Sequence, residues 1–237
     1  MVLVARRRCG AALVLAAALL LAGGCTQRPT FVPAAGTPTP SAGAPGPGAG
    51  PTPGPGPTPG ATPTASAPAA VRYAFPVRGP ASYARTHHDY PAADIMAPCG
   101  AAALAPVDGE VLEVSRVDRY RRAVDDGATR GGLSISILGR DGARYYGSHY
   151  AAIDPAVAPG RPVRAGQRIA AVGRTGDASA CHIHFGLSPA CARTGDWWLR
   201  RGAIWPADYL DAWRAGRPLS PARELRAWRR THGCPRA

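Results

Sequence analysis

Hydrophobic and polar residues alternate in short runs through the second half of the chain, a pattern typical of β-strands that bury one face. In one such run, Leu133, Ile135 and Ile137 alternate with Ser134 and Ser136. Short strands separated by Gly, Pro and Asp favour a mainly β domain, with an antiparallel sheet of sandwich-like or barrel-like form, over βαβ units. The predicted strands are Gly109–Val117, Leu133–Gly139, Ala143–Tyr150, Gln167–Val172 and Cys181–Leu187.

The C-terminal part of the chain has a different pattern. Pro206–Arg214 and Ser220–Arg230 predict helices, whereas Arg119–Gly131 is largely polar and predicts a loop. All five tryptophans lie between Trp197 and Trp228. We expect this helical extension to pack on the β domain through its Trp rings, although exposed Trp and Arg could instead contact a glycan or a partner.

The first residues have the pattern of an export signal. Three arginines at 6–8 precede an apolar run at 11–22 that is too short to span a bilayer, so residues 1–24 are predicted to be a signal peptide. The sequence Leu-Ala-Gly-Gly-Cys ending at Cys25 resembles the lipobox of bacterial lipoproteins. We therefore expect a lipid anchor on Cys25, which would hold the protein at the outer face of the cytoplasmic membrane, facing the cell wall. An ordinary signal peptide with an incidental Cys25 is the alternative.

Residues 25–71 form a Pro-, Gly- and Thr-rich segment, and 29–71 contain no charged side chain. Such a segment has too little apolar surface to offset the entropy of ordering, so it is predicted to be a disordered tether. The expected organisation is therefore a signal peptide, this tether, a folded domain at 72–190 and the extension at 191–237.

Composition and charge narrow the classes of function. No series of long apolar runs exists, which excludes a polytopic membrane protein. The net charge is +13 and every basic residue is Arg, so we expect attraction to polyanions. Anionic wall polymers are possible partners of an exported protein. Nucleic acid is not expected, because the chain has no RNP, helix-turn-helix or zinc-finger pattern.

The candidate chemistry lies in three patches that hold five of the six histidines: 87–94, 146–150 and 181–185. His182 and His184 are two residues apart in a predicted strand, so their side chains point to the same face. With Asp94 and an upstream His, these residues could form a zinc site of two histidines and one carboxylate. Three protein ligands leave a coordination position open for water, as in catalytic zinc sites.

The three patches together resemble the lysostaphin/LytM-type zinc endopeptidases of metallopeptidase family 23, which have the duplicated hybrid motif fold. The resemblance covers about residues 72–190. It is carried, in the family's order, by Asp94–Gly100 with Ala105–Val111, by Tyr146–His149, and by Val172–Gly176 leading into His182–Phe185.

This resemblance implies a zinc-dependent hydrolase of peptide bonds in bacterial peptidoglycan. It implies that His88, Asp94 and His184 bind Zn²⁺. It also implies that His149 and His182 flank the open coordination position, where one helps to deprotonate the attacking water and both donate hydrogen bonds to the tetrahedral oxyanion. We expect a monomer that acts on peptidoglycan peptides.

One departure from the family pattern affects the first ligand. Five residues separate His88 from Asp94 and six separate His87 from it, which is more than is usual in the family. Either imidazole could reach the metal, and we expect His88 because it needs the smaller excursion. If neither reaches it, the alternative is a catalytically silent LytM-like lipoprotein that binds the wall or activates another hydrolase.

Four cysteines remain after Cys9 and Cys25 are set aside, and an even number in an exported protein suggests disulfides. Three pairings are possible. We expect Cys181–Cys191, which would clamp the end of the His-containing strand, and Cys99–Cys234, which would pin the C-terminal tail.

Overall fold

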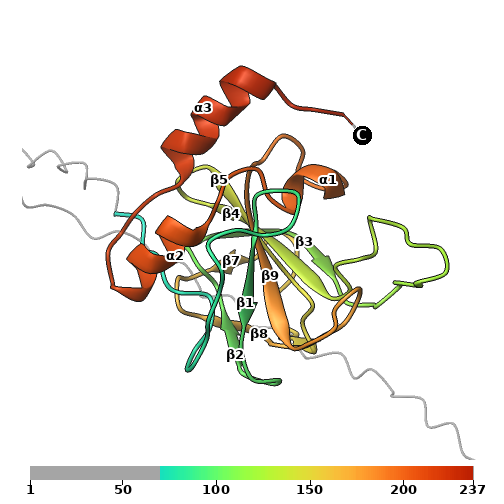
Figure 1. The fold of residues 1–237 in the computed structure, drawn as a ribbon. Helices are drawn as coiled ribbons and strands as arrows, with labels where there is room; N and C mark the ends of the chain where they lie inside the picture. Colours follow the sequence, from blue (N-terminus) through green and yellow to red (C-terminus); the bar gives the residue numbers. More distant parts are fainter. Residues whose placement is uncertain (1–69, 237) are drawn as a thin grey trace, which may run out of the picture. The chain divides into compact units, whose positions relative to one another are not determined.

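A computed structural model describes residues 70–236, which form two β-sheets and three helices (Figure 1). The strands are β1 (Ala93–Met96), β2 (Ala102–Leu104), β3 (Gly109–Ser115), β4 (Ser134–Gly139), β5 (Ala143–Ser148), β6 (Ala152–Ile153), β7 (Pro162–Val163), β8 (Arg168–Ala171) and β9 (His182–Pro189). The helices are α1 (Trp197–Arg200), α2 (Ala207–Arg214) and α3 (Ala222–His232). The predicted signal peptide 1–24, Cys25 and nearly all of the tether 25–71 lie outside the described residues.

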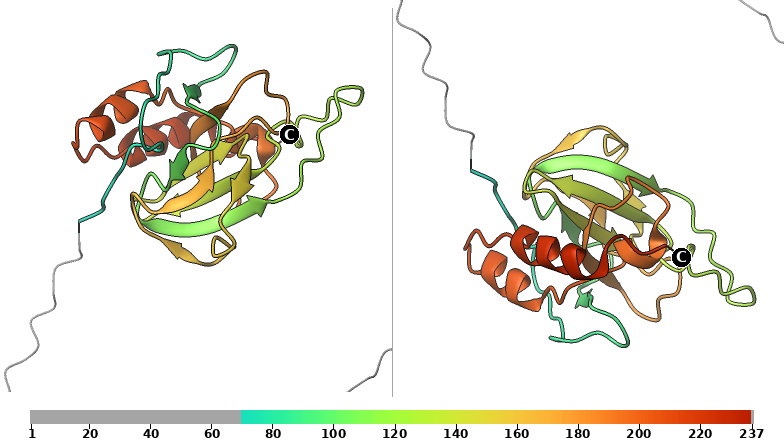
Figure 2. Two further views of the ribbon diagram at one scale, coloured as in Figure 1. Left: turned by 90° about the horizontal axis from the view of Figure 1, so that it is seen from below. Right: turned by 90° about the horizontal axis from the view of Figure 1, so that it is seen from above.

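The larger sheet has the strand order β1-β9-β5-β4-β3-β7, and the smaller sheet has the order β2-β8-β6. All pairings between these strands are antiparallel. The predicted mainly β, antiparallel fold with a helical C-terminal extension is therefore confirmed. The helices of the extension gather on one side of the strands, and the predicted loop 119–131 projects away from them (Figure 2).

Alternation along the sequence located the longer strands well. Each of the five predicted strands is present, with ends that differ by at most two residues. Both predicted helices are present as α2 and α3. The unpredicted elements β1, β2, β6, β7 and α1 have only two to four residues each, which is too few to show a period.

The hydrophobic core is centred on β9, all of whose residues are buried. Ile183, Phe185 and Leu187 lie on one face of this strand, and each is at most 2% exposed. Trp213 of α2 packs edge-on against Phe185, with ring centroids 6.1 Å apart. Trp213 of the extension is buried, whereas Trp205 is 42% exposed.

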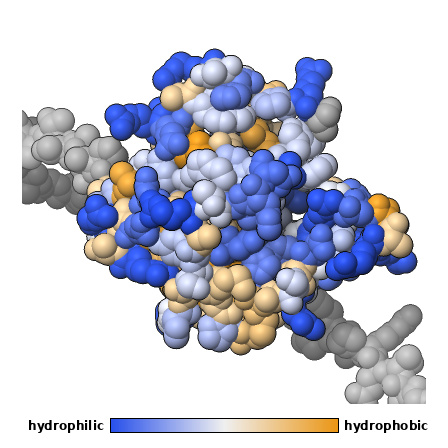
Figure 3. All heavy atoms as spheres, in the orientation of Figure 1, coloured by the Kyte–Doolittle hydropathy of each residue, from blue (hydrophilic) through white to orange (hydrophobic). Residues whose placement is uncertain are grey.

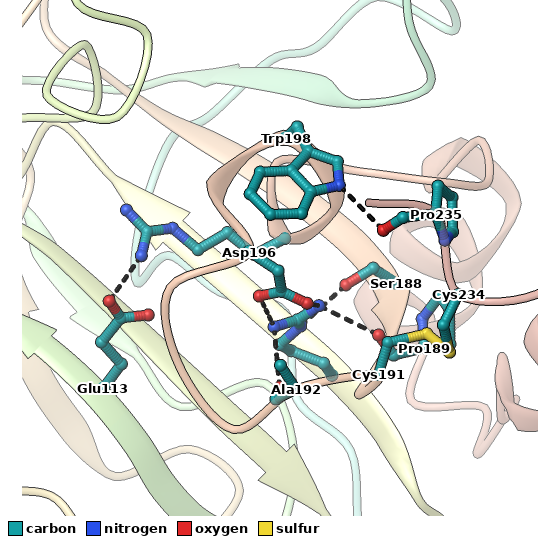
Figure 4. Close-up of polar contacts among 11 residues, drawn as sticks. Glu113, Ser188, Pro189, Cys191, Ala192, Asp196, Trp198, Cys234 and Pro235 are labelled. Atoms are coloured by element: carbon teal, nitrogen blue, oxygen red, sulfur yellow. Dashed lines mark hydrogen bonds and ion pairs between the residues drawn. A yellow bond between two sulfur atoms is a disulfide. The ribbon is translucent and has the colours of Figure 1, made fainter. Parts of the chain in front are cut away.

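A buried ion pair ties the extension to the sheet. Arg144 of β5 is fully buried, and its Nη2 donates to Asp196 Oδ2 at 2.7 Å and to the Pro189 carbonyl at 3.0 Å. Its Nε donates to Ser188 Oγ at 2.9 Å, and its Nη1 donates to Asp196 and to the Ala192 carbonyl. Asp196, Ser188, Pro189 and Ala192 surround the guanidinium in Figure 4. The Arg144 side chain therefore fixes the segment that leads into α1 to the sheet.

The disulfides differ from the predicted pairs. Cys99 is bonded to Cys181 and Cys191 to Cys234, so both predicted pairings, Cys181–Cys191 and Cys99–Cys234, are wrong. The reason is the unpredicted strand β1. It runs antiparallel to β9, so the end of β1 brings Cys99 beside the start of β9, with a Cα–Cα distance of 5.3 Å. The return of the chain along α3 then brings Cys234 to Cys191 (Figure 4).

Helix α3 buries one narrow side and exposes a basic one. Ala222 and Leu225 are buried, while the exposed residues include Arg223, Arg226 and Arg229. This helix, at the top of Figure 3, is mostly hydrophilic on the visible face. Among residues 70–236, no helix has the length and apolar character needed to cross a membrane.

Candidate active site

The functional side chains come from three neighbouring strands of the larger sheet. β9 lies between β1 and β5, and Asp94 of β1 stands directly opposite His184 of β9. Residues opposite each other in an antiparallel pair share one face, and so does a residue two positions along the strand. His182 therefore points to the same face as His184. His149 follows the end of β5, where Ser148 is also opposite His184.

Three of these groups can share a metal ion. Donor atoms of His87, Asp94 and His184 lie within 4.8 Å of one another. Asp94 is the central group, because its Oδ1 is 3.2 Å from His184 Nδ1 and its Oδ2 is 3.5 Å from His87 Nε2. Two imidazoles and one carboxylate form a donor set that suits zinc and leaves a fourth position open.

The structure brings His87, rather than the predicted His88, into this group. The His87 side chain is 7% exposed and its ring centroid is 5.0 Å from that of His184, whereas His88 is exposed. The Tyr90 ring packs 4.7 Å from the His87 ring. The insert before Asp94 therefore brings the more distant imidazole into the group, while His88 lines the same cleft but stays exposed.

Hydrogen bonds to the main chain determine which nitrogen of His184 faces the carboxylate. His184 Nε2 lies 2.9 Å from the carbonyl oxygen of Arg201, which can only accept, so Nε2 carries the hydrogen. In the neutral ring, Nδ1 then presents a lone pair to Asp94 Oδ1 at 3.2 Å. Two electron-rich atoms in such contact require a cation between them, either a proton or a metal ion. The residues therefore fit the metal that this donor set suggests.

His149 and His182 donate from Nδ1, whereas His184 donates from Nε2. His149 Nδ1 donates to the Thr175 carbonyl at 2.7 Å, and His182 Nδ1 donates to the Ala180 carbonyl at 2.9 Å. Each ring therefore presents Nε2 to the site, and His182 Nε2 is 3.7 Å from Asp94 Oδ1. The two ring centroids are 4.7 Å apart. Because neither ring belongs to the three-residue group, both are available for proton transfer and hydrogen bonding.

The surroundings set the charge of these groups. Burial raises the pKa of Asp94, but the close approach of His184 and the positive charge that the nearby imidazoles can carry outweigh this effect and lower the pKa to about 2. Burial lowers the pKa of His149 to about 4, and that of His87 also falls, chiefly through burial. The site therefore combines a charged carboxylate with a neutral imidazole at His149 near pH 7.

His149 also has an unusual backbone conformation. Its φ is +65°, in the left-handed region that non-glycine residues rarely adopt. Its backbone N–H donates to the Gly131 carbonyl at 2.9 Å, so the conformation is held from the main chain as well as through the side chain. Strained backbone of this kind is often found where a side chain must be aimed at a reaction site.

The group lies in a cleft with a wall that the sequence did not reveal. The loop that includes Gly131 lines one side, and Trp197, Arg200 and Arg201 of the C-terminal extension line another. Arg200 pairs with Glu113 at 2.6 Å (Figure 4). The only signal for this wall was the run of aromatic and basic residues at 197–201, which has no motif of its own.

Comparisons with known proteins match part of this chain. The family model named Peptidase family M23 matches residues 88–194. No curated protein sequence matches the chain.

The solved structures that match part of this chain include three bacterial peptidases. The catalytic domain of lysostaphin from Staphylococcus simulans is 22% identical, with 55% of this chain and 92% of that chain covered and a TM-score of 0.43. A putative glycyl-glycine endopeptidase LytM from Ruminococcus gnavus is 20% identical, with 62% of each chain covered and a TM-score of 0.47. A zinc-containing peptidase from Vibrio cholerae is 20% identical, with 56% of this chain and 38% of that chain covered and a TM-score of 0.40. This chain thus spans less than two thirds of the length of the last two proteins.

The matched segment contains Asp94, His149, His182 and His184, and it begins one residue after His87. The histidine patches of the sequence converge around Asp94 in the structure. Residues 88–194, somewhat less than half of the chain, therefore resemble peptidase family M23.

Proposed function

We propose that this protein is a zinc-dependent endopeptidase that hydrolyses peptide bonds in cell-wall peptidoglycan. The observation that carries the proposal is the arrangement of imidazoles around Asp94. Two of them complete a three-residue donor group with the carboxylate, and His149 and His182 present Nε2 to the same site. The match of residues 88–194 to a family of peptidases supports the reaction type.

In this proposal His87, Asp94 and His184 hold Zn²⁺. When bound there, the ion supplies a Lewis acid that polarises a carbonyl and makes water more acidic. The carbonyl of Arg201 keeps the Nδ1 lone pair of His184 directed toward the ion's position by accepting the hydrogen on Nε2.

We assign His149 as the general base. Burial lowers its pKa to about 4, so the imidazole is neutral near pH 7, and its Nδ1–H is already committed to Thr175. Nε2 can therefore accept a proton from the attacking water and later pass it to the leaving amine. His182 presents the same nitrogen, which, once protonated, can donate a hydrogen bond to the tetrahedral oxyanion.

We also propose an extracytoplasmic location, with a lipid anchor on Cys25 after removal of residues 1–24. The support is the sequence pattern around Cys25 and the wall-directed chemistry typical of the family. We further propose a monomer that is attracted to anionic wall polymers; removal of residues 1–24 takes away three arginines and no acidic residue, so 25 basic and 15 acidic residues leave a net charge of +10. Unchanged membrane fractionation of a Cys25→Ser variant would overturn the anchor.

Metal analysis combined with digestion of purified peptidoglycan tests the reaction. We expect His184→Ala to lose both zinc and activity, and His149→Ala to keep zinc but lose activity by roughly 100-fold or more, the size of a lost acid–base group. His87→Ala should also lose zinc, while His88→Ala is the matched control that should retain it.

The outcomes separate the alternatives. Full zinc occupancy in His184→Ala would overturn the proposed ligands. Zinc binding without hydrolysis by the unmodified protein would overturn the enzyme and favour the silent wall-binding or hydrolase-activating lipoprotein.

A further inference from the structure

The cleft contains one guanidinium that no acidic side chain of the described region neutralises. Arg130 pairs with Asp125 at 2.6 Å, and Arg200 pairs with Glu113 at 2.6 Å. Arg201 lines the same cleft, but among residues 70–236 it forms no ion pair. A cation without a partner beside a catalytic group is suited to bind an anionic part of a ligand.

Arg201 is held in place by packing. Its guanidinium carbon lies 4.0 Å from the centre of the Tyr90 ring and 5.5 Å from that of the Trp197 ring. Its main-chain carbonyl is fixed by the hydrogen bond from His184. These contacts restrict the side chain before any ligand arrives, which reduces the entropy lost on binding.

The polar atoms of Arg201 are not fully satisfied. Its Nε is buried and has no hydrogen-bond partner within the described region. A buried donor without a partner is unfavourable, so an acceptor that reaches Nε after a small movement of the side chain recovers free energy. The Tyr90 ring that supports Arg201 is 5.8 Å from the His184 ring, so the acceptor would lie close to the metal group.

We propose that Arg201 binds a carboxylate of the substrate and thereby selects peptides with a free carboxylate near the scissile bond over neutral peptides. A guanidinium is planar and can donate two parallel hydrogen bonds to a carboxylate. The carboxylate can belong to the C-terminus of the peptide or to an acidic side chain. This inference rests on the proposed function, and it concerns a residue that lies beyond the segment matched by the family.

Binding measurements test the inference independently of turnover. The parent is the His149→Ala protein with zinc bound, in which peptides should stay intact. Calorimetry compares three peptides of one length: a free C-terminal acid, its C-terminal amide, and the amide with one acidic side chain. We expect the free acid or the side-chain acid to bind roughly 10- to 100-fold more tightly than the neutral amide. Which of the two acids binds tightly identifies the source of the carboxylate.

Variants connect the preference to one residue. In the same background, Arg201→Gln should bind acid and amide equally, and Arg201→Lys should keep part of the preference through its charge. Arg130→Gln is the matched control, because this cleft residue is already paired with Asp125, and it should keep the full preference. Zinc content and thermal unfolding of each variant establish that it is folded.

Two results would overturn the role of Arg201: equal binding of both acidic peptides and the neutral amide by the parent, or an unchanged preference in folded Arg201→Gln. Hydrolysis of peptidoglycan by the unmodified protein is measured separately. Hydrolysis without a carboxylate preference overturns only the role of Arg201. A preference without hydrolysis overturns the proposed enzyme and leaves Arg201 as a carboxylate-binding residue.

Discussion

Two carboxylates pack against β9 and its neighbours, and they have opposite surroundings. Asp196 faces Arg144 in a fully buried pair, and each nitrogen of the guanidinium has an oxygen partner (Figure 4). Asp94 has a side chain that is 31% exposed and faces three imidazole nitrogens at 3.2 to 3.7 Å, longer than good hydrogen bonds to a carboxylate. The polar atoms of the Arg144–Asp196 pair are satisfied without any ligand, whereas those around Asp94 are not.

This difference separates a group that stabilises the fold from one that is arranged for chemistry. A buried ion pair stabilises only when its remaining hydrogen-bonding positions are satisfied, and the Arg144 network meets that condition. The lone pair of His184 and the carboxylate of Asp94 meet with no donor between them unless a cation enters. Polar groups that are incompletely satisfied in this way are common at functional sites.

The largest effect is expected from breaking the complete pair. Arg144→Met leaves the Asp196 carboxylate buried without its partner, and loss of one member of a buried pair costs about 3–5 kcal/mol. Urea denaturation should show this loss in the free energy of unfolding. Arg144→Met combined with Asp196→Leu is the matched control, because removal of both charges is often close to neutral. A single variant within about 1 kcal/mol of the unmodified protein would contradict the structural role of the pair.

Asp94→Asn should have the opposite pattern of effects, with a large loss of zinc affinity and a smaller loss of stability. Stability of the metal-free protein should fall less than in Arg144→Met, because Asp94 is partly exposed and its contacts with the imidazoles are long, while zinc affinity should fall more than the roughly 10- to 100-fold that loss of an outer partner costs. Zinc at 100 times its dissociation constant should stabilise the unmodified protein by about 2.7 kcal/mol, and this gain should disappear in the variant. Thermal unfolding with and without a chelator measures both. Destabilisation of metal-free Asp94→Asn as severe as that of Arg144→Met would remove the contrast between the two sites.

The parts of the site that sequence reasoning located are those that depend on local geometry. His182 and His184 share a face because they are two residues apart in one strand, and alternation identified that strand. The antiparallel fold followed from the same signal. Asp94 and His149 were recognised from motifs, and their strands lie beside β9 as those motifs require.

The parts that were missed depend on packing between distant segments. The direction of His87 rather than His88 depends on how Tyr90 packs, which the spacing to Asp94 leaves open. The disulfides depend on the pairing of β1 with β9, and β1 is too short to be predicted. Arg201 acts through its main-chain carbonyl and its place on a wall of the cleft, and neither property has a sequence pattern.

A third carboxylate, Asp108, has surroundings intermediate between those of Asp196 and Asp94. Its substitution should have the smallest effect on stability. It is buried, but its partner Arg72 is 62% exposed, and its oxygens accept from Arg72 at 3.0 Å and from the backbone N–H of Ala165 at 2.9 Å. The hydrogen bond from Arg72 lowers the pKa of Asp108 in the folded state. The unfolded chain therefore binds the proton at a higher pH, and the stability from Asp108 is present above its unfolded pKa and is lost as the pH falls through the folded value. Urea denaturation of the unmodified protein and of Asp108→Asn should show a small difference in stability at pH 7 that shrinks toward pH 3. A difference that stays constant over this range would show that Asp108 stabilises the fold through packing rather than through its charge. Asp108 would then resemble neither Asp196 nor Asp94.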